Sequence, residues 1–68
     1  MTFGKRLRSM RKMRFLTGAE LADAVGVSQA TIYAYEQDRT EPQISTAIAM
    51  SVVFGCTIEE LLFGEAKT

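Results

Sequence analysis

Residues 17–36 constrain the fold of this chain more than any other segment, because they predict two short helices joined by a tight turn. Thr17 and Glu20 have the spacing of a capping box, in which each side chain bonds the backbone N–H of the other residue at a helix start. Gly26 can adopt the left-handed conformation that ends a helix, and Ser28 can cap the helix that follows. The two predicted helices cover residues 18–25 and 29–36.

The rest of the sequence predicts three further helices and no strand. Apolar residues at helical spacing indicate a first helix over residues 3–14 and another over 44–54, which Gly55 ends. Thr57 and Glu60 form a second capping box that opens a last short helix. We therefore expect an all-α fold of five helices, in one domain over residues 1–68, with a frayed tail at residues 65–68.

Composition narrows the class of protein. The sequence has no run of 18 apolar residues, so we expect no membrane span. The single cysteine, Cys56, has no partner for an internal disulfide, which favours a reducing, cytoplasmic location and a small buried side chain. The sequence contains no histidine that could act as a general base or zinc ligand, and it has no glycine-rich phosphate loop. We expect neither catalysis nor a metal, cofactor or small-molecule ligand.

The formal net charge of zero hides an uneven distribution. Residues 1–14 carry six Lys or Arg and no acid, whereas residues 15–68 carry two Lys or Arg against eight Asp or Glu. A basic helix on an acidic body can orient a protein towards a polyanion. It can equally be an ordinary solvated helix, and the sequence leaves both interpretations open.

Many spaced positions agree at once with one known pattern. They are Phe3, Gly4, Leu7, Arg11, Leu16, Thr17, Leu21, Ala22, Val25, Gly26, Val27, Ser28, Ile32, Glu36, Pro42, Phe54, Gly55, Ile58, Leu61 and Leu62. With these residues, the chain resembles the lambda-repressor-like (Cro/XRE-type) helix-turn-helix family. The resemblance implies a transcriptional regulator, of repressor type, that binds a pseudo-palindromic operator in double-stranded DNA as a homodimer. The helix over residues 29–36 would lie in the major groove.

The resemblance also implies which residues meet DNA. Base contacts would come from Gln29, Ala30, Thr31, Tyr33 and Ala34, and Gln29 could pair bidentately with adenine. Tyr33 could instead pack its ring on the preceding helix. Phosphate contacts would come from Thr17, Gly18, Arg14, Arg39 and Thr40, the first two through backbone amides at a helix start.

An internal ion pair between Arg11 and Glu36 is a further implication of the resemblance. The alternatives are a phosphate contact for Arg11 and a solvated helix end for Glu36.

The sequence departs from the family pattern at three places. Gly18 stands where relatives often have a glutamine, so a side-chain phosphate contact is lost. Phe15 stands where Gly or Asn is common, and strain in a left-handed Phe predicts a different turn; its ring could also meet a partner. Asp38 and Glu41 bring negative charge to a loop near the DNA. The alternative function is a protein-interaction module, such as an antitoxin-like or accessory regulator, with weak or lost DNA binding.

The helix over residues 44–54 is unusually apolar. The resemblance places Ala47, Met50, Ser51 and Phe54 inward, which leaves further apolar residues without a partner. We expect these to form a homodimer interface with the exposed side of the last helix; the alternative is scattered surface Val and Ala. The interface residues would be Ala49, Val52, Val53, Ile58 and Phe63.

Overall fold

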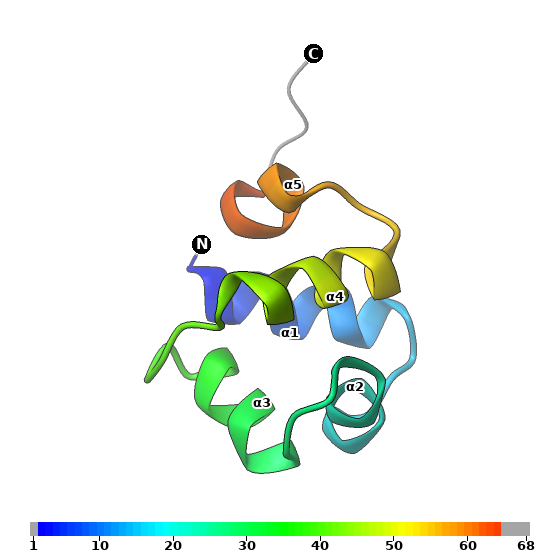
Figure 1. Cartoon of the computed structure of the whole chain (residues 1–68), viewed down its shortest axis with the longest axis vertical. Helices are drawn as coiled ribbons and strands as arrows, with labels where there is room; N and C mark the ends of the chain where they lie inside the picture. Colours follow the sequence, from blue (N-terminus) through cyan, green and yellow to red (C-terminus); the bar gives the residue numbers. More distant parts are fainter. Residues whose placement is uncertain (1, 65–68) are drawn as a thin grey trace.

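The computed structural model describes residues 2–64, and within this range it contains five helices and no strand (Figure 1). The helices are α1 (Phe3–Met13), α2 (Gly18–Val25), α3 (Gln29–Glu36), α4 (Ile44–Phe54) and α5 (Ile58–Phe63). The predicted all-α fold is confirmed. Only α1 differs, because it ends at Met13 rather than Arg14. The predicted frayed tail lies outside the described residues.

Local capping explains where most helices begin and end. Thr17 with Glu20, and Thr57 with Glu60, form the two predicted capping boxes at the starts of α2 and α5. Ser28 accepts a bond from the Thr31 amide and so caps α3. The C-terminal glycines of α2, α4 and α5 have positive φ values, a conformation that glycine adopts with little steric cost. They are Gly26, Gly55 and Gly64.

Each helix contributes at least one fully buried side chain to a single core. The largest are Leu7, Leu21, Ile32, Met50, Phe54 and Leu61. Burial of each such side chain contributes roughly 1.5–3 kcal/mol, so this cluster is the main source of stability. The inward face of α4 consists of Ala47, Met50, Ser51 and Phe54, as predicted. Cys56 is half-buried and packs against the core, and its burial raises the pKa of the thiol.

The turn between α1 and α2 corrects the expectation for Phe15. Phe15 adopts the left-handed conformation, with φ of 58°, rather than changing the turn. Three hydrogen bonds hold it there: the Phe15 amide to the Lys12 carbonyl, the Leu16 amide to the Arg11 carbonyl, and the Arg11 guanidinium to the Leu16 carbonyl. The ring itself is 93% exposed and meets little steric resistance. The neighbours therefore impose the conformation.

The arrangement of the helices leaves α3 on the outside (Figure 1). α2 and α3 pack against each other at one end of the molecule, α1 lies behind α4, and α5 covers the opposite end. α3 also packs against α1. In the described part of the chain, no helix has the length and apolar character needed to cross a membrane.

Candidate nucleic-acid interface

The outer face of α3 carries the five residues that were predicted to contact bases. Ile32 and Tyr35 are buried and fix the orientation of α3 against the core. Gln29 and Ala30 are exposed at the start of the helix, Thr31 and Ala34 are half-exposed, and Tyr33 is 44% exposed. The helix therefore presents one short polar and small-residue surface to solvent.

Hydrogen bonds within α3 and to its N-cap already involve three of these side chains. The Gln29 Nε2 donates to the Tyr33 hydroxyl across 2.9 Å, and the hydroxyls of Thr31 and Ser28 lie 2.8 Å apart. The Tyr33 ring also lies beside Gly18 at the start of α2, close enough that a Cβ on Gly18 would be 3.1 Å from its Cε1. Tyr33 thus packs on α2, one of the two alternatives open for it, and still exposes part of its side chain.

The start of α2 lies beside α3 and offers backbone amides to solvent. Its capping box uses the amides of Thr17 and Glu20, at 2.8 and 3.1 Å. An anion would therefore have to bind the other amides of the first turn, including that of Gly18. The Glu20 carboxylate already neutralises part of the positive helix end, so this end is a weaker anion site than an uncapped one.

Arg11 and Glu36 form an ion pair that ties α1 to the end of α3. Arg11 Nε donates to Glu36 Oε2 at 2.6 Å, and Nη2 donates to Oε1 at 3.2 Å. Only 10% of the Arg11 side chain and 6% of the Glu36 side chain are exposed. The hydrogen bond to the carboxylate raises the pKa of Arg11 above its ordinary value. Bidentate geometry of this kind is among the stronger charged hydrogen bonds.

Two other arginines of the basic N-terminal segment bind the carboxyl ends of helices. Arg14 donates to the Phe54 carbonyl at the end of α4, and Arg6 donates to the carbonyls of Leu61 and Leu62 in α5, at 3.3 and 2.9 Å. Cations at these positions complement the negative end of the helix dipole. The Arg14 side chain, assigned to phosphate from the sequence, therefore has an internal partner here.

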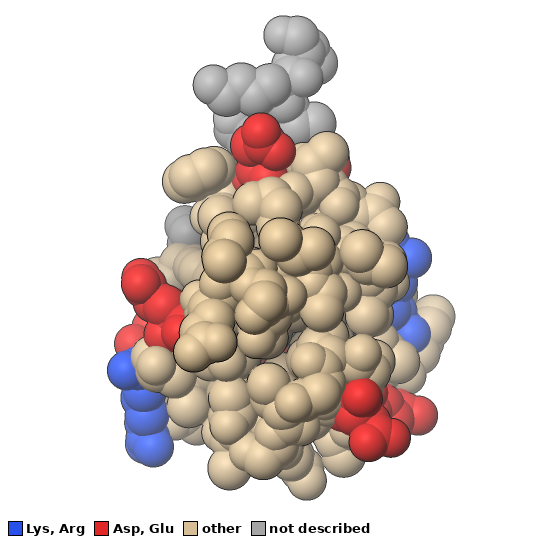
Figure 2. Space-filling model, in the orientation of Figure 1, with Lys and Arg blue, Asp and Glu red and all other residues tan. Residues whose placement is uncertain are grey.

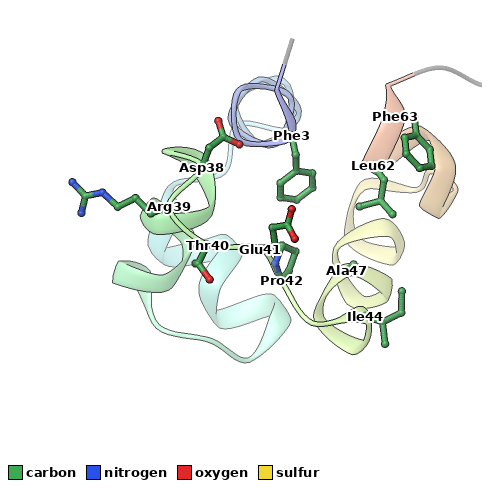
Figure 3. Close-up of a pocket in the computed structure, with 10 residues that line it drawn as sticks. All are labelled: Phe3, Asp38, Arg39, Thr40, Glu41, Pro42, Ile44, Ala47, Leu62 and Phe63. Carbon is green, nitrogen blue, oxygen red and sulfur yellow. The ribbon is translucent and has the colours of Figure 1, made fainter.

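The loop between α3 and α4 carries Arg39 and Thr40, which are both exposed. It lines a pocket of about 570 Å³ together with parts of α1, α4 and α5, and Figure 3 shows Arg39 pointing away from that pocket into solvent. Its neighbour Asp38 instead points back to the start of α1. There it accepts bonds from the Thr2 hydroxyl at 2.6 Å and the Gly4 amide at 2.9 Å. These bonds lower the pKa of Asp38.

The outward face of α4 is apolar, and its residues differ from the predicted set. Ile44, Ile48 and Val52, which are spaced by four residues, are 67%, 50% and 75% exposed and form one line, here named the α4 stripe. Figure 2 shows this side of the molecule free of charged side chains over α4. Ala49 is half-buried, and Val53 and Ile58 pack against the core, which corrects their expected exposure. Phe63 is exposed as expected.

Comparison with known proteins decides the family. A family model described as helix-turn-helix matches residues 7–61. The chain belongs to the lambda-repressor-like (Cro/XRE-type) helix-turn-helix family. The helix-turn-helix is α2, the turn at Gly26 and α3.

Individual relatives share this helix-turn-helix at moderate identity. The chain is 33% identical over 65 residues to an uncharacterised HTH-type transcriptional regulator, YqaE, of Bacillus subtilis. It is 36% identical over 62 residues to the repressor protein C2 of Salmonella phage P22. These matches cover 96% and 91% of this chain, but only 56% and 29% of the two relatives. The chain thus spans about half or less of the length of these relatives.

A solved helix-turn-helix structure matches over nearly its whole length. The crystal structure of the P22 c2 repressor protein in complex with a synthetic operator has a TM-score of 0.91 and 34% identity to this chain. The alignment covers 96% of this chain and 98% of that one. The solution structure of the DNA-binding domain of the same repressor has a TM-score of 0.89.

Sequence reasoning named Gly4 and Asp38 but missed the contacts through which they shape this helix-turn-helix domain. Gly4 lies so close to the end of α3 that a Cβ on it would be 2.5 Å from the Glu36 carbonyl oxygen. Asp38 was interpreted only as a charge opposing DNA, and its bonds to the Thr2 hydroxyl and the Gly4 amide at the start of α1 were missed. The only available signal was Gly4 itself, a glycine early in a predicted helix.

In residues 2–64, no group of three or more His, Cys, Asp or Glu side chains could hold a metal ion.

Proposed function

We propose that this chain is a sequence-specific DNA-binding transcriptional regulator of repressor type, with α3 in the major groove of double-stranded DNA. The observation that carries the proposal is the solvent face of α3, which Ile32 and Tyr35 hold outward on a fold close to that of an operator-bound repressor. An α-helix presented in this way fits the width of the major groove.

The proposed base contacts follow from the side chains on that face. The Gln29 amide can donate to N7 and accept from the N6 amino group of adenine. Ala30 and Ala34 are small enough to let α3 approach the bases closely and can contact a thymine methyl group. Thr31 and Tyr33 carry hydroxyls that can bond to bases or to the sugar–phosphate edge.

The proposed phosphate contacts surround α3 on two sides. The start of α2 lies on one side, where the Gly18 amide is the first candidate and Thr17 a secondary one, because the Thr17 amide is bonded to the Glu20 carboxylate. Arg39 and Thr40 of the α3–α4 loop lie on the other side. Arg14 is a secondary candidate, because its guanidinium would have to leave the Phe54 carbonyl to reach a phosphate.

We further propose that the protein binds a pseudo-palindromic operator as a homodimer through the α4 stripe and Phe63. Ala49, Val53 and Ile58 would lie at the border of this interface. The second copy is the occupant that fits best, because a face without charges can meet itself without repulsion, as a two-fold interface requires. Two recognition helices would then contact half-sites about one helical turn, or roughly 34 Å, apart. No catalytic role is proposed, and the proposed location is the cytoplasm, where such DNA lies.

Selection from a random duplex library tests this function. The purified protein would be used at two salt concentrations, and the bound sequences would be read by sequencing. A pseudo-palindrome with half-sites about 10–11 base pairs apart supports a dimeric sequence-specific regulator. No enrichment at either salt, with circular dichroism showing a folded helical protein, contradicts it. That result would favour the alternative of a protein-interaction module, which the zero net charge and the charge-free α4 face would suit.

A further inference from the structure

The side chains of Gln29 and Tyr33 are hydrogen-bonded to each other on the exposed face of α3. They are four residues apart and therefore adjacent on the helix surface. The Gln29 Nε2 donates to the Tyr33 hydroxyl across 2.9 Å. An exposed glutamine side chain is ordinarily mobile, so this bond restricts the residue that is best placed to read a base.

Tyr33 is itself held by the start of α2. A Cβ placed on Gly18 would lie 3.1 Å from Cε1, 3.3 Å from Cζ and 3.4 Å from the hydroxyl oxygen of the Tyr33 ring. The two distances to carbon are shorter than an ordinary van der Waals contact. A side chain at position 18 would therefore require the Tyr33 ring to shift by a few tenths of an ångström. Gly18 is buried, although it lies in the first turn of a surface helix.

We propose that Gly18 and Tyr33 are positioning residues that orient the Gln29 amide for adenine recognition. This inference rests on the DNA-binding function proposed above. The absence of a side chain at Gly18 lets the Tyr33 ring lie close to the start of α2, and the tyrosine hydroxyl then fixes the amide of Gln29. Specificity at one base would thus depend on a contact between the two helices of the helix-turn-helix.

The chemistry of the amide group supports this arrangement. A glutamine amide has two N–H donors and one carbonyl acceptor. One N–H is used by Tyr33, so one N–H and the carbonyl oxygen remain, which are the donor and the acceptor that adenine N7 and N6 require. Ordering the side chain before binding removes an entropic cost that would otherwise weaken readout. That cost corresponds to about a two- to twelve-fold change in affinity for one side chain.

Removal of the tyrosine hydroxyl tests the positioning role without DNA. In Tyr33→Phe the ring stays and only the acceptor is lost. The side-chain amide of Gln29 would be followed by 15N relaxation in the free protein, in the wild type and in the variant. We expect an ordered amide in the wild type and a mobile one in Tyr33→Phe. Equal mobility in both proteins would overturn the proposal, whatever the DNA-binding result.

A second variant tests the part that Gly18 plays. Gly18→Val places methyl groups against the Tyr33 ring and should mobilise the Gln29 amide as Tyr33→Phe does. Ala19→Val, at an exposed neighbouring position of α2, is the matched control and should not. An ordered Gln29 amide in Gly18→Val, with the protein folded, would contradict the role of Gly18.

A double-mutant cycle on DNA then tests the link to specificity. Tyr33→Phe should reduce the preference for adenine at the selected position about two- to twelve-fold, and it should have no further effect when Gln29 is already Ala. An equal loss of adenine preference in the Gln29→Ala background would show that Tyr33 acts on that base pair without Gln29, and would overturn the positioning role. If the wild type has an ordered amide but selects no sequence, the proposed function fails and the readout role fails with it.

Discussion

Phe15 is the residue whose backbone departs furthest from its intrinsic preference. A left-handed backbone costs a residue with a Cβ roughly 1–2 kcal/mol. The exposed Phe15 ring gains little burial energy to offset this cost. The conformation persists because the Leu16 side chain packs against the core and the Leu16 carbonyl accepts a hydrogen bond from Arg11. The backbone strain at Phe15 is therefore the energetic cost of a turn that lets Arg11 make this bond.

Replacing Phe15 should reveal that cost. Phe15→Gly removes the ring and relieves the backbone, whereas Phe15→Ala removes the ring alone. We expect Phe15→Gly to be more stable than Phe15→Ala by about 1 kcal/mol, measured by urea denaturation. Equal stabilities would mean that the turn relaxes in the alanine variant.

A second prediction at the level of single residues concerns the Arg11–Glu36 ion pair, which should be essential for stability. Glu36→Gln leaves the Arg11 charge buried without its counter-charge, so we expect the free energy of unfolding to fall by about 3 kcal/mol. Urea denaturation followed by circular dichroism measures it. The exposed Glu41→Gln is the matched control and should change stability by no more than about 0.5 kcal/mol. Similar values for the two variants would refute the bracing role.

At the scale of elements, helix ends are completed by distant residues. The start of α1 is held by Asp38 of the α3–α4 loop, through Thr2 and Gly4. The carboxyl ends of α4 and α5 are held by arginines of the N-terminal segment, Arg14 and Arg6. Charged side chains that a sequence alone would assign to the solvent thus form hydrogen bonds between helices.

The Asp38 cap predicts a particular response to acid. Hydrogen bonds from Thr2 and Gly4 lower the pKa of Asp38 in the folded state below the ordinary value of 3.8. The carboxylate therefore stabilises the fold fully above pH 3.8, and this stabilisation is lost as the pH falls through the lower, folded-state pKa. Thermal unfolding between pH 7 and 2 should show a smaller acid loss in Asp38→Asn than in the wild type. Parallel curves would exclude Asp38 as a source of the acid response.

The α4 stripe gives a prediction for assembly. Val52→Asp puts a charge on an exposed position, so the monomer should fold normally while the proposed dimer dissociates. Sedimentation equilibrium over a concentration series measures this. Ala24→Asp, at an exposed position of α2, is the control and should dimerise as the wild type does. A wild type that stays monomeric into the submillimolar range would refute the dimer.

At the scale of the whole molecule, the sequence predicts those features that depend on residues close together in the chain, such as the ends of helices. Thr17 and Glu20 are three residues apart, and Gly26 and Gly55 act on their own helices, so helix bounds follow from local chemistry. The contacts of Gly4 with the Glu36 carbonyl, and of Arg14 with Phe54, join residues far apart in sequence. They depend on how the helices pack, which residue spacing does not contain. For the site, the face of α3 was predictable, and packing of Tyr33 on the preceding helix was one of two alternatives. The bond between Gln29 and Tyr33 and the place of Gly18 in that packing were not predicted.

The internal use of arginines predicts weak dependence of DNA binding on salt. Each phosphate neutralised on B-DNA contributes about −0.9 to the slope of log K against log salt concentration. Because Arg6, Arg11 and Arg14 bond to groups of the domain itself, Arg39 is the arginine of the proposed phosphate contacts that should contribute most to the slope. Arg39→Ala should reduce its magnitude by about one, as measured by fluorescence anisotropy, while Arg39→Lys should preserve it. An unchanged slope in Arg39→Ala would remove Arg39 from the phosphate contacts.

The bond from Arg6 to the end of α5 also has a consequence for biosynthesis. Arg6 and its acceptors at Leu61 and Leu62 are 55 and 56 residues apart. During translation, α1 therefore leaves the ribosome well before α5, the helix to which Arg6 donates. The core is incomplete while α5 is still inside the exit tunnel, because Leu61 is one of its fully buried members. We expect the domain to reach its full stability as one unit only after α5 has left the ribosome.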